Sequence, residues 1–177
     1  MAKKVVGLIV GLVLFIGLPL FIKGLTNNKL SIGYNKGYMP DQPIPFSHQL
    51  HAGENKIACQ YCHVGTEEVR HAGVPSVNIC MNCHLVVKAG SPHIQKLTEY
   101  YTSGKSVPWK KVHLLPDHVK FNHQAHVLAG KQCQECHGPV ENMETVYQHS
   151  DLSMGWCVNC HRQPENNASV NCGVCHY

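Results

Sequence analysis

The longest apolar stretch of the chain lies at its amino terminus. Residues 5–22 carry no charge over 18 positions, and Lys3 and Lys4 precede them. This length is at the short end for a membrane-spanning helix and long for the core of a signal peptide. No clear small-x-small cleavage site follows, so we expect residues 1–25 to form a transmembrane anchor, with a cleaved signal peptide as the alternative. Pro19 is expected to kink this helix near its end.

The paired lysines predict the orientation of the anchor. Positive residues favour the cytoplasmic side, so the amino terminus is expected inside and the rest of the chain on the periplasmic side of the inner membrane. Residues 26–45 then carry Gly, Asn and Pro, which predicts an extended linker.

Beyond the linker, the polar and apolar positions show little regular alternation. Ser91-Pro92 is a typical helix start, Gly104 suits a helix end, and Ile94, Leu97 and Tyr101 would share one face between them. No convincing strand pattern occurs. We therefore expect a mostly α-helical and irregular body with little strand.

All ten cysteines lie in Cys-x-x-Cys-His motifs, and none is left over. In chain order, motifs 1 to 5 are Cys59-Gln-Tyr-Cys62-His63, Cys80-Met-Asn-Cys83-His84, Cys133-Gln-Glu-Cys136-His137, Cys157-Val-Asn-Cys160-His161 and Cys172-Gly-Val-Cys175-His176. This pattern is typical of c-type haem attachment. The two thiols bond to the haem vinyl groups and the histidine binds the iron as proximal ligand. The sequence therefore predicts five covalent haems c.

Other uses of paired cysteines fit less well. Structural zinc sites combine four ligands, and five pairs do not divide into such sets. Neither a zinc site nor a disulfide framework requires a histidine after every second cysteine.

Composition agrees with a haem protein. Aromatic residues make up only 7% of the chain, so porphyrins would supply much of the apolar mass. Fourteen histidines are present, of which five belong to the motifs. The net charge of +4 is modest, and no phosphate loop, paired-carboxylate site or nucleophile motif stands out. We expect no nucleic-acid partner and no active site besides the haems.

An internal repeat divides the body. Phe46-Ser-His48-Gln-Leu-His51 corresponds to Phe121-Asn-His123-Gln-Ala-His126, and each precedes two haem motifs with a lone histidine between them. The second copy adds motif 5. We expect a two-haem module at 46–88, a helical connector and loop at 89–116, and a three-haem module at 117–177.

The repeated Phe-x-His-x-x-His motif resembles that of the small multihaem cytochromes of the c3 and c7 type. The resemblance implies that the sixth iron ligands are histidines. It pairs His48 with His63, His51 with His84, His123 with His137, His126 with His161, and His149 with His176. His71 has no iron in its own module, although it could reach one in the other, and Met154 or Met81 could replace one histidine. His93, His113 and His118 are interpreted as ordinary histidines.

Longer phrases resemble the pentahaem cytochrome subunit of bacterial alternative complex III. They are Gly37-Tyr-Met-Pro-Asp-Gln-Pro-Ile-Pro, Leu115-Pro-Asp-His-Val-Lys-Phe-Asn-His, His137-Gly-Pro-Val-Glu-Asn-Met-Glu and Ser153-Met-Gly-Trp-Cys-Val-Asn-Cys-His-Arg. The resemblance implies an electron-transfer subunit. It would receive electrons from quinol-oxidising membrane subunits and an iron–sulfur subunit, and pass them to a monohaem cytochrome c or a terminal oxidase.

Two other functions stay open. One is a tethered quinol-dehydrogenase cytochrome that feeds a periplasmic reductase, although such proteins typically have four haems. The other is a multihaem reductase, which would need an open iron position.

Overall fold

The computed structural model describes residues 2–26 and 35–177, so residues 27–34 of the predicted linker lie outside the described residues. The chain divides into two units, Met1–Tyr34 and Asn35–Tyr177, and each is described by itself.

The first unit is an apolar helix with a change of register. It consists of α1 (Ala2–Leu12), the π-helical segment η1 (Val13–Gly17) and α2 (Leu18–Thr26), with the Leu18 amide donating to the Val13 carbonyl. Pro19 has no amide hydrogen and its ring would collide with the carbonyl four residues earlier. A wider π turn just before the proline accommodates this. The predicted disturbance at Pro19 is therefore a change of hydrogen-bond register.

This helix is long and apolar enough to cross a membrane. The span Val5–Gly24 has 20 residues with a mean hydropathy of 2.9, and its most apolar 18 residues are not buried within the structure. A secretory signal sequence would meet the same criteria of length and composition.

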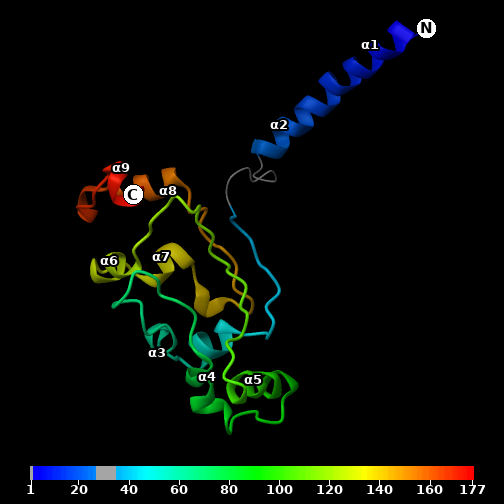
Figure 1. Ribbon diagram of the computed structural model, residues 1–177. Coiled ribbons are helices and arrows are strands. Elements are labelled where there is room, and N and C mark those ends of the chain that lie inside the picture. Colours follow the sequence, from blue (N-terminus) through cyan, green and yellow to red (C-terminus); the bar gives the residue numbers. More distant parts are fainter. Residues whose placement is uncertain (1, 27–34) are drawn as a thin grey trace. The chain divides into compact units, whose positions relative to one another are not determined.

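The second unit is built from short helices joined by irregular chain, and residues 35–177 contain no strand. Its α-helices are α3 (Cys59–Cys62), α4 (Val77–His84), α5 (Pro92–Thr102), α6 (His123–Leu128), α7 (Cys133–His137), α8 (Met154–His161) and α9 (Cys172–Cys175). The remaining turns are the π-helical η2 (Gln49–Glu54) and the 3₁₀ segments η3 (Val140–Asn142) and η4 (Pro164–Asn166). Within this unit, α4 and α5 lie at one end, α8 and α9 lie at the other, and α3, α6 and α7 lie between them (Figure 1).

Side-chain caps start most of the short helices that carry haem motifs or their histidines. Asn122 caps α6, Ser153 caps α8 and Asn171 caps α9, each accepting a hydrogen bond from a backbone amide two or three residues on. In α7 the capping box is formed by Gln132 and Glu135, whose carboxylate accepts from the Gln132 amide at 2.7 Å. Such caps satisfy amides that have no partner inside the helix.

The apolar core of this unit is small. It consists of Ile44, Met81, Leu97 and Val107, with half-buried side chains around them. Leu97 comes from the predicted connector helix, which is α5. Tyr101 was expected on the same face but is 41% exposed, and Tyr100 packs against the core instead. Tyr100 lies three residues after Leu97, so it shares the inward face at this end of α5.

A buried glutamine joins three separate segments of the unit. Gln148 is fully buried, and its Oε1 accepts a hydrogen bond from the Leu114 amide at 3.0 Å. Its Nε2 donates to the carbonyls of Ser150 and Asp151, and its backbone amide donates to the Tyr38 carbonyl. A fully paired buried amide of this kind fixes the segments around it. It matters below because His113 and His149 lie next to these residues.

Candidate haem-attachment sites

The five haem motifs share one local geometry. Each places its two cysteines within a short helix, and the histidine directly follows the second cysteine. Residues at i, i+3 and i+4 share one face of a helix, so both thiols and the imidazole can face one porphyrin. Motifs 2 and 4 differ in length only, because they lie within the longer helices α4 and α8.

All ten cysteines are free thiols. In the described residues, no group of three or more His, Cys, Asp or Glu side chains is arranged to hold a metal ion directly. Thioether attachment is the chemistry that this arrangement of cysteines fits.

Hydrogen bonds set the tautomer of four proximal histidines. Nδ1 lies at 3.3 Å from the Gly73 carbonyl in His63, 2.9 Å from the Val87 carbonyl in His84, 2.7 Å from the Ser169 carbonyl in His161, and 3.0 Å from the His118 carbonyl in His176. A carbonyl can only accept, so Nδ1 must carry the hydrogen. The Nε2 of each neutral ring then has a free lone pair, as an iron ligand requires.

Two histidines of the repeated motif are held in the same way. His51 Nδ1 lies 2.7 Å from the Ser47 carbonyl, and His126 Nδ1 lies 2.7 Å from the Asn122 carbonyl. Both acceptors lie four residues before the histidine, so the repeat preserves this contact as well as the sequence. Phe46 and Phe121 each contact both histidines that follow them.

Three of the expected histidine pairs lie at a spacing that fits one iron. The ring centroids are 6.1 Å apart in His51–His84, 6.0 Å in His123–His137 and 5.8 Å in His126–His161. Two metal–nitrogen bonds of about 2 Å, with the distance from nitrogen to ring centre added twice, give about 6.3 Å. In His51–His84 and His126–His161, both Nδ1 atoms bond to carbonyls, so Nε2 is the free nitrogen in all four rings.

His48 and His63 are also neighbours. Burial, together with the nearby rings of His63 and His51, lowers the pKa of His48 to about 4. The Nδ1 of His48 is buried and has no hydrogen-bond partner. A neutral buried imidazole beside a proximal histidine fits the role of a distal ligand.

The surroundings of His176 differ from the expected pairing with His149. The ring beside His176 is that of His118, with centroids 5.6 Å apart, whereas the His149 ring lies against Gly138. The His118 carbonyl accepts from Nδ1 of His176, so the backbone of residue 118 orients the His176 ring. The sequence did not indicate this role of His118.

Comparison with known proteins agrees with this chemistry. Residues 119–177 match the family described as cytochrome c7 and related cytochrome c. The multiheme cytochrome c subunit of menaquinone reductase from Nitratidesulfovibrio vulgaris (strain Hildenborough) is 34% identical over 161 residues, covering 77% of each chain. The chain belongs to the multihaem cytochromes c of the c7 type. Covalent haem c and a role in electron transport follow from this membership, and both expectations are confirmed.

Interactions between cysteine thiols of different motifs show which motifs of the cytochrome are neighbours. Burial raises the pKa of Cys62, and the Cys83 thiol of motif 2 raises it further, so motifs 1 and 2 adjoin. Burial likewise raises the pKa of Cys133, with Cys59 of motif 1 as the next cause, so motifs 1 and 3 adjoin.

The same reasoning connects the remaining motifs. Burial, then Glu135, then Cys160 and Cys157 of motif 4 together raise the pKa of Cys136 to about 11. Burial raises the pKa of Cys157, and Cys175 of motif 5 is the next cause. The motifs therefore adjoin in the order 2, 1, 3, 4, 5, which agrees with the sequence of α4, α3, α7, α8 and α9 along the body in Figure 1.

The alternative iron ligands considered from the sequence lie in different surroundings. Met81 is 2% exposed within the apolar core, and Met154 is 67% exposed at the start of α8. His71 is exposed, but its segment reaches the second module, because the Arg70 carbonyl accepts from the His123 amide at 3.0 Å. His71 is also one of the neighbours that lower the pKa of His123, after burial and two other histidines.

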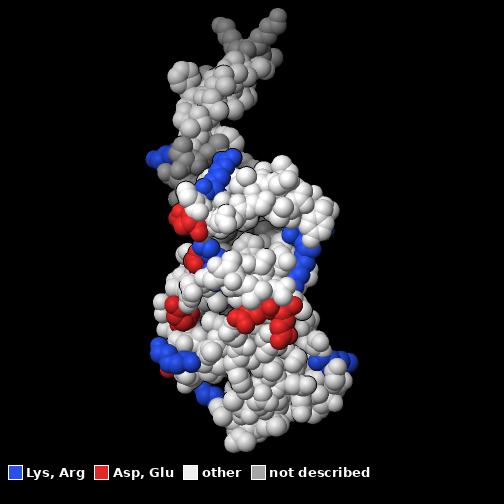
Figure 2. Space-filling view, turned by 90° about the vertical axis from the view of Figure 1, so that its left-hand side faces the viewer, with Lys and Arg blue, Asp and Glu red and all other residues white. Residues whose placement is uncertain are grey.

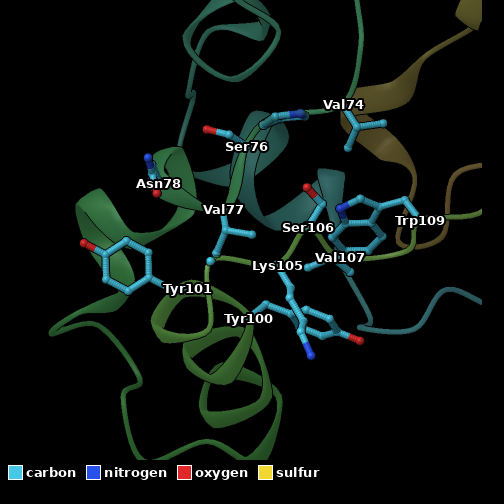
Figure 3. A pocket seen from close by; sticks show the side chains of 12 residues that line it. Val74, Ser76, Val77, Asn78, Tyr100, Tyr101, Lys105, Ser106, Val107 and Trp109 are labelled. Atoms are coloured by element: carbon cyan, nitrogen blue, oxygen red, sulfur yellow. The ribbon is translucent and has the colours of Figure 1, made fainter.

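One cavity of the cytochrome lies beside the helix that carries motif 2. It has a volume of about 480 Å³ and is lined by the loop before α4, the first turn of α4 and the segment from Tyr100 to Trp109 (Figure 3). Its lining contains no cysteine and no histidine. We therefore assign no haem to it.

Proposed function

We propose that this cytochrome is a membrane-anchored conductor that carries electrons along five haems. The observation that carries the proposal is the unbroken series of neighbouring motifs 2, 1, 3, 4, 5. Each motif pairs two thiols with a histidine, so each can hold one porphyrin within the series. The two ends of the series, at motifs 2 and 5, are the points where electrons enter and leave.

In this proposal all five irons have two histidine ligands. The proximal ligands are His63, His84, His137, His161 and His176, and the distal ligands are His48, His51, His123, His126 and His149. Six-coordinate iron changes its geometry little between oxidation states, which favours electron transfer over substrate binding. The three pairs near 6 Å and the buried neighbour of His63 support the first four assignments. The fifth rests on the c7 resemblance.

Haem stoichiometry tests the count of five. The mature protein should carry five haems per chain, and acid-acetone should extract none because each is held by two thioethers. Intact-protein mass and a pyridine haemochrome assay measure this directly. A fully matured protein with four or fewer haems would contradict the count.

We propose that the cytochrome works within a quinone-linked membrane complex. The apolar helix Val5–Gly24 supports an anchor, and Lys3 and Lys4 favour a periplasmic haem body. The resemblance to alternative complex III favours electron flow from quinol to a periplasmic acceptor. The name of the relative favours a second candidate with the opposite direction, in which electrons reach menaquinone.

The face shown in Figure 2 has no patch of a single charge sign on which a partner could dock. Lysine, arginine and acidic side chains are interspersed there, and most of that face is uncharged. We therefore expect association through this face to depend little on long-range attraction of one sign.

Purification from native membranes tests both candidates. We expect quinone-reactive membrane subunits and an iron–sulfur subunit to co-purify with the cytochrome. Added quinol should reduce the haems if flow is outward. If flow is inward, reduced haems should be oxidised by added quinone while quinol leaves them oxidised. Haems that respond to neither quinol nor quinone would contradict a quinone-linked role.

A further inference from the structure

One proximal histidine differs from the other four in the partner of its Nδ1. In motifs 1, 2, 4 and 5 this nitrogen bonds to a backbone carbonyl. In motif 3, Nδ1 of His137 lies 3.1 Å from Nε2 of His113, and the two rings meet edge to face with centroids 4.3 Å apart.

We propose that His113 is a positioning residue that lowers the reduction potential of the haem held by motif 3, by accepting a hydrogen bond from the iron-bound His137. The inference rests on the proposed function, because it requires His137 to bind iron. It adds a difference between the central haem and its neighbours that neither the motifs nor the repeat indicates.

Geometry excludes His113 as a ligand to the same iron. Two metal–nitrogen bonds would separate the nitrogens by about 4 Å, whereas these two are 3.1 Å apart. Because Nδ1 of His137 makes the contact with His113, Nε2 is the nitrogen left for iron, and the centroid of the His123 ring lies 6.0 Å from that of His137. His113 therefore contacts the nitrogen of His137 that does not bind iron.

The positions of the hydrogens on the two rings follow from this contact. When Nε2 of His137 binds iron, its Nδ1 carries the hydrogen and donates it. His113 must accept on Nε2, which places its own hydrogen on Nδ1. An imidazole nitrogen is a more basic acceptor than a peptide carbonyl, so it draws the proton away from His137 more strongly. A more electron-rich ligand stabilises ferric over ferrous iron, and the haem potential falls.

The surroundings hold His113 in place. Its ring is half-buried, and the next residue, Leu114, donates its amide to the side chain of the fully buried Gln148 at 3.0 Å. The contact with His137 therefore belongs to a fixed part of the fold.

Redox titration of the full-length protein tests the proposal. His113→Leu removes the acceptor, and one of the five midpoint potentials should rise while four stay unchanged. His113→Gln offers an amide oxygen of carbonyl type, so its shift should be smaller and in the same direction. His93→Leu, an exposed histidine on α5, is the matched control and should shift no potential.

Spectra of the same samples separate the possible failures. The low-spin signals should persist in every variant, because His113 does not bind iron. Unchanged potentials in His113→Leu would overturn the inference, and so would a new high-spin haem, which would make His113 a ligand. Wild-type protein with fewer than five low-spin haems would instead count against the proposed function.

A measurement on the wild-type protein tests the inference even if the variants fail to mature. In the fully reduced, diamagnetic protein labelled with heavy nitrogen in histidine, one scalar coupling should connect two imidazole nitrogens across a hydrogen bond. Carbonyl acceptors cannot produce this signal, so its absence would also overturn the inference.

Discussion

Replacing His123 by alanine should leave the haem of motif 3 five-coordinate and high-spin. The centroids of the His123 and His137 rings are 6.0 Å apart, a spacing that fits two ligands of one iron. His113 cannot substitute for it, because His113 contacts the nitrogen of His137 that does not bind iron. Electron paramagnetic resonance and resonance Raman spectra should show one high-spin haem and four low-spin haems, and the reduced variant should gain one site for carbon monoxide.

The matched control is His71→Ala. His71 lies close enough to His123 to contribute to its lowered pKa, but it is exposed and the c7 pattern gives it no iron in its own module. It should keep five low-spin haems. A high-spin haem in His71→Ala, together with an unchanged spectrum in His123→Ala, would transfer the ligand role to His71.

Much of this site could be predicted from local sequence. The spacing of two cysteines and a histidine specifies one helical turn, and the structure contains such a turn at every motif. The resemblance of the repeated Phe-x-His-x-x-His to the c3 and c7 motif led us to expect particular pairs of histidine rings. His51–His84, His123–His137 and His126–His161 all lie near 6 Å.

The partners of the Nδ1 atoms could not be predicted in the same way. His113 and His118 lie in irregular chain before α6, where no periodicity relates them to motifs 3 and 5. Their positions depend on long-range contacts, such as the Leu114 amide on Gln148 and the Lys120 amide on the Cys175 carbonyl. The only sequence signal was the number of spare histidines, which exceeds the number of irons.

The order of the motifs in space also has no local signal. Chain order would place motif 2 between motifs 1 and 3, whereas the structure places motif 1 there. The contact arises from packing of the first module on the second, where the Arg70 side chain donates to the Phe121 carbonyl and the Arg70 carbonyl accepts from His123. Such contacts between modules can be read only from the folded chain.

This order leads to the prediction with the largest expected effect. Removing the haem of motif 3 with Cys133→Ala and Cys136→Ala should stop electron flow between the two ends of the cytochrome. Motif 3 is the point where the series passes from motif 1 to motif 4. Electron tunnelling falls off exponentially with distance, so skipping one porphyrin should slow the crossing by orders of magnitude.

Rapid reduction measurements give a specific signature. With two haems on each side of the gap, a donor acting at either end should quickly reduce half of the remaining haem absorbance and leave the other half oxidised. Removal of a terminal haem provides the contrast. Loss of the entry haem should prevent fast reduction, while loss of the exit haem should allow fast reduction of all four remaining haems but no transfer to the acceptor. Fast reduction of all four haems in the motif 3 variant would show a second route and refute the linear order. Comparing variants of motifs 2 and 5 then identifies the entry end, because only one of them should abolish fast reduction by the native donor.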